Sequence, residues 1–134
     1  MTFFCIFIFV NKPIGIYDSG TGGLTVAKAI AEMLPNESFI YFGDTAHLPY
    51  GDKSKESIQL YSKRISDFLI GKGCKALVIA CNTASAHAYA TLTERHPEIP
   101  IINVVDPTVE YCVKDKSYKK IGIIATKGTV TSRI

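Results

Sequence analysis

Short apolar runs that stop abruptly in polar loops constrain the fold of this chain more than any other feature. The clearest run, 76–80, has the length and the β-branched centre of a buried strand. Cys81, Asn82 and Thr83 follow it at once, and a helical pattern begins near Ala84. Because Asn, Thr and Ser cap new helices, we expect a strand, a tight turn and a helix, with a thiol at the turn.

Two upstream segments have the same design. The run 14–17 ends in the turn 18–23, which contains Asp18 and three glycines, and the run 38–42 ends in the polar loop 43–51. Strands that alternate with helices form a parallel sheet with helices on both faces. The carboxyl ends of such strands open onto one edge, so we expect these polar loops to meet there.

The whole chain follows this alternation, and the predicted fold class is α/β with a doubly wound parallel sheet. The expected strands are 12–17, 38–42, 76–80, 99–105 and 120–125, and the expected helices are 24–34, 55–70, 84–96 and 108–115. The predicted parts are an apolar leader at 1–11, a first α/β lobe at 12–106 that carries Asp18 and Cys81, and the start of a second lobe at 107–134.

Cys81 and Asp18 are the candidate reactive groups. A helix N-terminus presents free N–H groups and a partial positive charge, which favour a thiolate at Cys81, although a buried cysteine that only packs is the alternative. The glycine-rich turn fits neither the dinucleotide fingerprint nor the P-loop. The Asp18 carboxylate would repel a phosphate, so this turn suits an ammonium group or a proton, unless Asp18 merely caps the turn.

Composition excludes several other classes. Hydrophobic residues make up 47% and charged residues 20%, as in a soluble globular domain. Four cysteines without a repeated spacing predict neither a metal site nor a disulfide framework, which favours a reducing, cytoplasmic location. The net charge of +3, with mixed signs in 114–120, argues against nucleic-acid binding. The leader is too short to span a bilayer, lacks signal-peptide features, and is interpreted as a mis-start or an added strand.

Three motifs closely resemble those of the cofactor-independent glutamate racemases, within the aspartate/glutamate racemase superfamily. They lie at 15–26, 43–51 and 78–85, and a fourth, weaker match lies at 121–130. Aspartate racemases share the Cys-Asn-Thr turn but differ around the first glycine loop, so the glutamate branch is favoured.

The resemblance implies that two cysteines act on glutamate from opposite faces, without cofactor or metal. Cys81 matches the cysteine that removes the α-proton, and Asp18 matches the carboxylate beside it. The positions that match substrate-binding residues are Asp18, Ser19, Tyr50, Gly51, Asn82 and Thr83, with Thr126 and Thr129 reaching in from the second lobe. The implied role is the supply of D-glutamate for peptidoglycan, and full-length members of the family are expected to be homodimers.

One departure from the family bears on this expectation. The second cysteine belongs to a Gly-Cys-Thr-His motif in the later half of the family, and these 134 residues contain no such motif. The expectation is therefore the N-terminal portion of a glutamate racemase, with one catalytic base. Two alternatives stay open: another enzyme of the superfamily, such as an aspartate racemase or a decarboxylase, and an inactive remnant that binds an amino acid.

Overall fold

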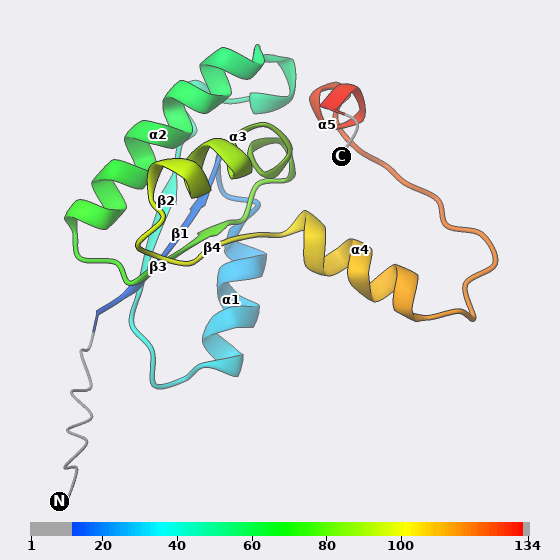
Figure 1. Cartoon of the computed structure of the whole chain (residues 1–134), viewed down its shortest axis with the longest axis horizontal. Coiled ribbons are helices and arrows are strands. Elements are labelled where there is room, and N and C mark those ends of the chain that lie inside the picture. Colours follow the sequence, from blue (N-terminus) through cyan, green and yellow to red (C-terminus); the bar gives the residue numbers. More distant parts are fainter. Residues whose placement is uncertain (1–11, 133–134) are drawn as a thin grey trace, which may run out of the picture.

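A parallel four-stranded sheet forms the centre of the structure, a computed structural model that describes residues 12–132 (Figure 1). The strands are β1 (Ile14–Asp18), β2 (Phe39–Gly43), β3 (Ala76–Ile79) and β4 (Ile101–Asn103), in the order β2-β1-β3-β4. The α-helices are α1 (Leu24–Met33), α2 (Lys55–Gly71), α3 (Asn82–Arg95), α4 (Val105–Lys114) and α5 (Lys127–Ser132), and the 3₁₀ turns are η1 (Thr45–His47) and η2 (Tyr50–Asp52). The predicted α/β class with a parallel sheet is confirmed, while the leader 1–11 lies outside the described residues.

The strand register brings the polar loops together. β1 pairs in parallel with β2 on one side and with β3 on the other. Asp18 lies opposite Gly43, and Tyr17 lies opposite Ile79. The carboxyl ends of the three strands therefore lie at one edge of the sheet, as expected for parallel strands joined by helices.

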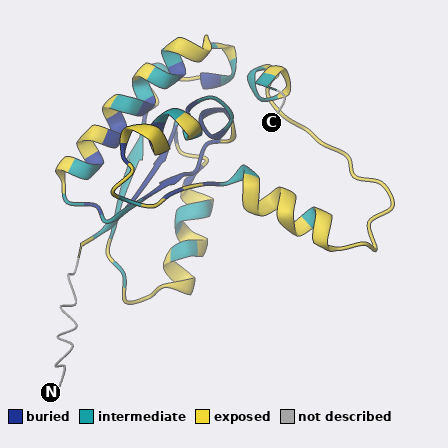
Figure 2. Ribbon diagram, in the orientation of Figure 1, coloured by how far each residue is buried: buried dark blue, intermediate teal, exposed yellow. Residues whose placement is uncertain are grey.

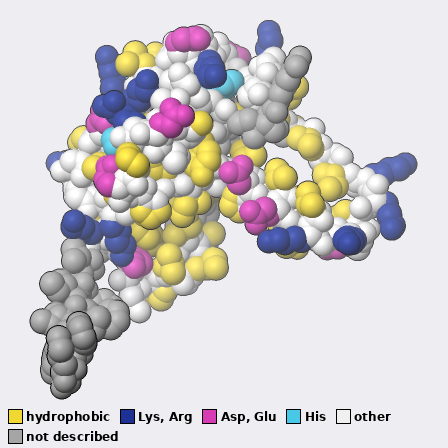
Figure 3. All heavy atoms as spheres, in the orientation of Figure 1, with side chains coloured by type: hydrophobic (Ala, Val, Ile, Leu, Met, Phe, Trp, Pro, Cys, Tyr) yellow, Lys and Arg dark blue, Asp and Glu magenta, His cyan; other side chains and the backbone are white. Residues whose placement is uncertain are grey.

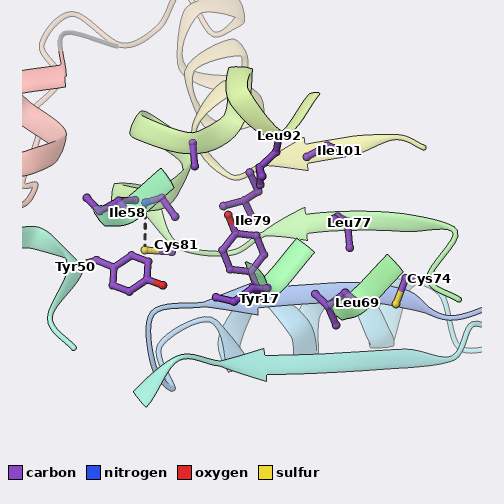
Figure 4. Packing of buried hydrophobic residues seen from close by; sticks show 13 residues of the cluster. Tyr17, Tyr50, Ile58, Leu69, Cys74, Leu77, Ile79, Cys81, Leu92 and Ile101 are labelled. Atoms are coloured by element: carbon purple, nitrogen blue, oxygen red, sulfur yellow. Dashed lines mark hydrogen bonds between the residues drawn. The ribbon is translucent and has the colours of Figure 1, made fainter. Parts of the chain in front are cut away.

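Helices cover both faces of the sheet, and each face has its own apolar cluster (Figure 2). On one face, α2 and α3 pack over β1 and β3, where Tyr17, Leu77 and Leu92 are fully buried (Figure 4). On the other face, Ile16 and Val78 meet residues of α1. Burying a large apolar side chain contributes roughly 1.5–3 kcal/mol, so these clusters fix the positions of the strand ends.

The predicted strand at 120–125 is wrong. This segment has no regular secondary structure, and Ile123 and Ile124 are 85% and 102% exposed. A strand needs a neighbour to pair its N–H and C=O groups, and no strand among residues 12–132 lies beside this one. An apolar, β-prone sequence therefore did not suffice to form a strand here.

Other boundaries also differ from the expectation. β4 is shorter than the predicted 99–105, and α4 begins at Val105 rather than at 108. The Asn103 side chain, one residue before the N-cap Val104, accepts hydrogen bonds from the N–H groups of Val105 and Asp106, both at 2.9 Å, and so satisfies the first N–H groups of this earlier helix start. Pro107 is tolerated because it falls in the first turn of the helix.

After α4, the chain extends away from the sheet and then returns. Figure 1 shows the segment between α4 and α5 running apart from the rest, and α5, which was not predicted, contacts α3 and η2. Hydrophobic side chains lie in the open around α4 and this segment (Figure 3). No helix of residues 12–132 is both long enough and apolar enough to cross a membrane.

Candidate functional site

A cleft of about 610 Å³ opens at the carboxyl edge of the sheet. The turns after β1 and β3 form most of its wall, and the start of α1 together with Leu48, Val104, Thr108 and Thr126 completes it. Six of the predicted site residues line it: Asp18, Ser19, Cys81, Asn82, Thr83 and Thr126. Tyr50, Gly51 and Thr129 do not line it.

Cys81 is itself the N-cap residue of α3. Its Sγ accepts a hydrogen bond from the Ala84 N–H at 3.4 Å (Figure 4). The same Sγ lies 3.6 Å from the Ser19 Oγ. The prediction placed the caps after the cysteine, with the helix beginning at Ala84, whereas the helix begins at Asn82. The sulfur therefore lies against the N–H groups of a helix N-terminus, which favour negative charge.

Asp18 both organises the glycine-rich turn and lines the cleft. Its Oδ2 accepts hydrogen bonds from the N–H groups of Gly20 at 3.2 Å and Gly23 at 2.9 Å, and Ser19 Oγ donates weakly to Oδ1 at 3.4 Å. The two interpretations of Asp18 from the sequence are thus compatible. The carboxylate holds the turn through one oxygen while the residue stands in the cleft with Cys81.

Tyr50 lies under the site rather than in it. It is 2% exposed, belongs to the same apolar cluster as Cys81, and donates from its hydroxyl to Asp44 Oδ2 at 2.6 Å. Burial and the Asp44 carboxylate raise the pKa of Tyr50 well above its usual range, so its hydroxyl stays protonated. Asp44 Oδ1 also lies 2.7 Å from His47 Nδ1, and the Asp44 N–H donates to the Asp18 carbonyl at 2.9 Å.

Asp44 is the residue that sequence reasoning missed as a site component. It is buried, its N–H joins the loop 43–51 to Asp18, and its side chain holds Tyr50 within the same loop. Its sequence position was a usable signal, since it directly follows the strand that ends at Gly43.

Thr126 closes the cleft from the far end of the chain. Its Oγ1 lies 2.9 Å from Thr83 Oγ1 and 3.0 Å from Thr129 Oγ1, within hydrogen-bonding distance of both. A Cβ on Gly51 would lie 3.0 Å from the Thr126 Cβ, so the glycine permits this close approach. Gly51 and Thr129 therefore support Thr126 from behind instead of facing the cleft.

Two further features concern the histidines and metal binding. His87 Nε2 lies 3.1 Å from the Gly128 carbonyl, which requires a proton on that nitrogen and ties α3 to α5. Within 12–132, no group of three or more His, Cys, Asp or Glu side chains is placed to hold a metal ion.

Leu48, Val104 and Thr108 also line the cleft, and no sequence signal singled them out.

Comparison with known proteins gives one consistent result. The family model described as Asp/Glu/Hydantoin racemase matches residues 19–134. A glutamate racemase of Corynebacterium diphtheriae is 50% identical over 122 residues, which cover 91% of this chain and 46% of the relative.

Solved structures agree with the sequence match. The glutamate racemase of Francisella tularensis, determined in complex with D-glutamate, is 44% identical with a TM-score of 0.84, over 92% of this chain and 46% of that one. The Thermus thermophilus glutamate racemase, in complex with β-chloro-D-alanine, is 44% identical with a TM-score of 0.83. The match covers 91% of this chain and 46% of that one. The chain thus spans about half the length of the relatives it matches.

Proposed function

We propose that the cleft of this chain, which belongs to the Asp/Glu/Hydantoin racemase family, binds glutamate and exchanges the proton on the α-carbon. The observation that carries the proposal is the placement of the Cys81 thiol at the N-terminus of α3, in one cleft with Asp18 and Ser19. The names of the relatives, glutamate racemases, supply the substrate.

Cys81 is assigned the role of the base. As a thiolate it takes the α-proton: the Cα–H bond breaks, an S–H bond forms, and the electron pair spreads from the α-carbon into the α-carboxylate. Return of a proton to the same face restores the starting enantiomer, and return to the opposite face inverts it. The thiolate is suited to this step because helix N–H groups stabilise its charge without removing it from the cleft.

The remaining cleft residues are assigned to substrate binding. The Asp18 carboxylate would attract the ammonium group and assist proton movement. The N–H groups at the start of α3, with Asn82 and Thr83, would hold a carboxylate, because helix N-termini bind anions. Ser19 and Thr126 contribute hydroxyls from two sides of the cleft, while Tyr50, Gly51 and Thr129 act on the substrate only through the residues they support.

We assign the second base to the half of the relatives that this chain does not match. We place the boundary of the first lobe at 106 and regard 107–134 as the beginning of the second. The exposed apolar side chains of Val109, Val113, Ile123 and Ile124 support this division, since they lack cover among residues 12–132. The family role that follows is cofactor-independent supply of D-glutamate for peptidoglycan in the cytoplasm, with complete members pairing as dimers.

The test is exchange of the α-proton of L- and D-glutamate in deuterated water, followed by ¹H NMR. We expect the purified chain to exchange at least one enantiomer, and Cys81→Ala to abolish exchange while circular dichroism stays unchanged. Cys112→Ala, a half-buried cysteine on α4, is the matched control and should exchange like the unmodified chain.

Three results would contradict the proposal. Undiminished exchange in Cys81→Ala would remove the assignment of the base. Faster exchange of aspartate than of glutamate would favour an aspartate racemase. Saturable binding of glutamate without any exchange would favour a protein that only binds the amino acid.

A further inference from the structure

A second pocket lies between the loop 43–51 and α2. It has a volume of about 220 Å³ and is formed by the end of β2 and by α2. None of the residues that line it also lines the cleft with Cys81. It is therefore a separate cavity, and the proposed function gives it no role.

Aromatic side chains form most of its wall. The rings of Phe42 and Phe68 meet edge to face, with centroids 5.6 Å apart, and Ile65 lies with them in the pocket. The His47 ring stacks on Tyr61, with centroids 4.0 Å apart and an angle of 21° between the planes. A wall of aromatic side chains suits a planar aromatic group.

The charges around the pocket favour an anion. Both Asp44 carboxylate oxygens lie within 2.9 Å of His47 Nδ1, and one also accepts from the Tyr50 hydroxyl, so this negative charge is already hydrogen-bonded. Arg64 lines the pocket and forms no ion pair with any residue of 12–132. A guanidinium group binds a carboxylate through two parallel hydrogen bonds.

We infer that this pocket binds a small aromatic carboxylate, with the ring against Phe42, Tyr61 and Phe68 and the carboxylate on Arg64. The size agrees, because an apolar cavity of about 150 Å³ accepts benzene, and about 220 Å³ leaves room for one substituent. The inference goes beyond the proposed function and does not depend on the role of Cys81.

Asp44 connects this pocket to the cleft. Its side chain lines the pocket and accepts from Tyr50, which packs in the cluster that contains Cys81. Its main-chain N–H donates to the Asp18 carbonyl at 2.9 Å. A ligand that presses on His47 and Asp44 therefore acts on the loop beneath the cleft without entering the cleft.

The test uses 4-fluorobenzoate as the probe, observed by ¹⁹F NMR, with ¹H–¹⁵N spectra of the full chain. For a ligand of about ten heavy atoms we expect a Kd on the order of 1 mM. The largest amide shifts should fall in residues 42–50 and 61–68. Saturating glutamate should not displace the probe, because the two cavities share no lining residue.

Two variants separate this site from non-specific attraction. Arg64→Gln should weaken binding about tenfold, while Lys28→Gln removes the same charge from α1, where the side chain is 78% exposed, and should leave the Kd unchanged. Phe68→Ala should weaken binding as well, and Phe68 is 45% exposed, so the fold tolerates the change. The inference is overturned if the probe does not bind at 10-fold the expected Kd, if Arg64→Gln binds as tightly as Lys28→Gln, or if the largest shifts fall in 18–23 and 81–83.

Discussion

The substitution Gly23→Ala tests how tightly the glycine-rich turn is packed against the strands. A Cβ at this position would lie 2.6 Å from the Asp18 Cβ and 2.9 Å from the Ala80 Cβ. Ordinary carbon contacts are about 3.5–4.0 Å, and neither neighbour is the end of a flexible side chain, so the turn itself must move by about 1 Å. That movement also lengthens the hydrogen bond from the Gly23 N–H to Asp18 Oδ2, now 2.9 Å.

The size of the effect follows from three contributions. Overpacking of this kind costs about 1–3 kcal/mol, and weakening a hydrogen bond to a buried carboxylate costs up to about 1.5–3 kcal/mol. Gly23 has φ −65° and ψ −9°, which alanine adopts readily. Alanine also lowers the conformational entropy of the unfolded chain, which stabilises the folded protein by about 0.5–1 kcal/mol. We therefore expect the free energy of unfolding to fall by about 2–4 kcal/mol.

Urea denaturation followed by circular dichroism measures this change. With an m-value of about 2 kcal/mol/M, the midpoint should fall by about 1–2 M. Gly22→Ala is the matched control, because its Cβ would meet only Asp18 Oδ2 at 3.7 Å, and we expect a change within about 0.5 kcal/mol. Equal midpoints for the two variants would refute the reasoning.

Three further predictions concern buried and paired groups. Tyr50→Phe removes the 2.6 Å donor to Asp44 and should lower the free energy of unfolding by about 1–3 kcal/mol, measured by the urea midpoint. Hydrogen bonds from Arg95 lower the pKa of Asp67 in the folded chain. The Asp67 carboxylate therefore stabilises the fold at a pH above its unfolded pKa of about 3.9, and this contribution is lost as the pH falls through the lower pKa of the folded chain. Since both side chains are nearly half exposed, Asp67→Asn should cost at most about 1 kcal/mol at pH 7, and this cost should shrink as the pH falls below about 3.9, in parallel urea titrations. Burial raises the pKa of Cys74, so iodoacetamide at pH 8 should label this thiol in urea but not in the folded chain, as read by peptide mass.

Local sequence patterns determined most of the sheet and the placement of the two reactive candidates. The runs before Asp18 and Cys81 are buried strands of a parallel sheet, and the helical patterns after them became α1 and α3. Parallel strands joined by helices necessarily end at the same edge. The meeting of Asp18, Ser19 and Cys81 in one cleft could therefore be predicted without coordinates.

Long-range packing decided what the patterns left open. The Tyr50 hydroxyl turned to Asp44 in the interior instead of to the cleft, because the loop 43–51 folds beneath the strand ends. Thr126 reached Thr83, 43 residues earlier in the chain, through a segment whose own sequence predicted a strand. Periodicity indicates which residues prefer burial or strand pairing. A strand, a buried hydroxyl or a closed cleft also needs a partner that is distant in sequence. Only the tertiary structure decides whether that partner is present.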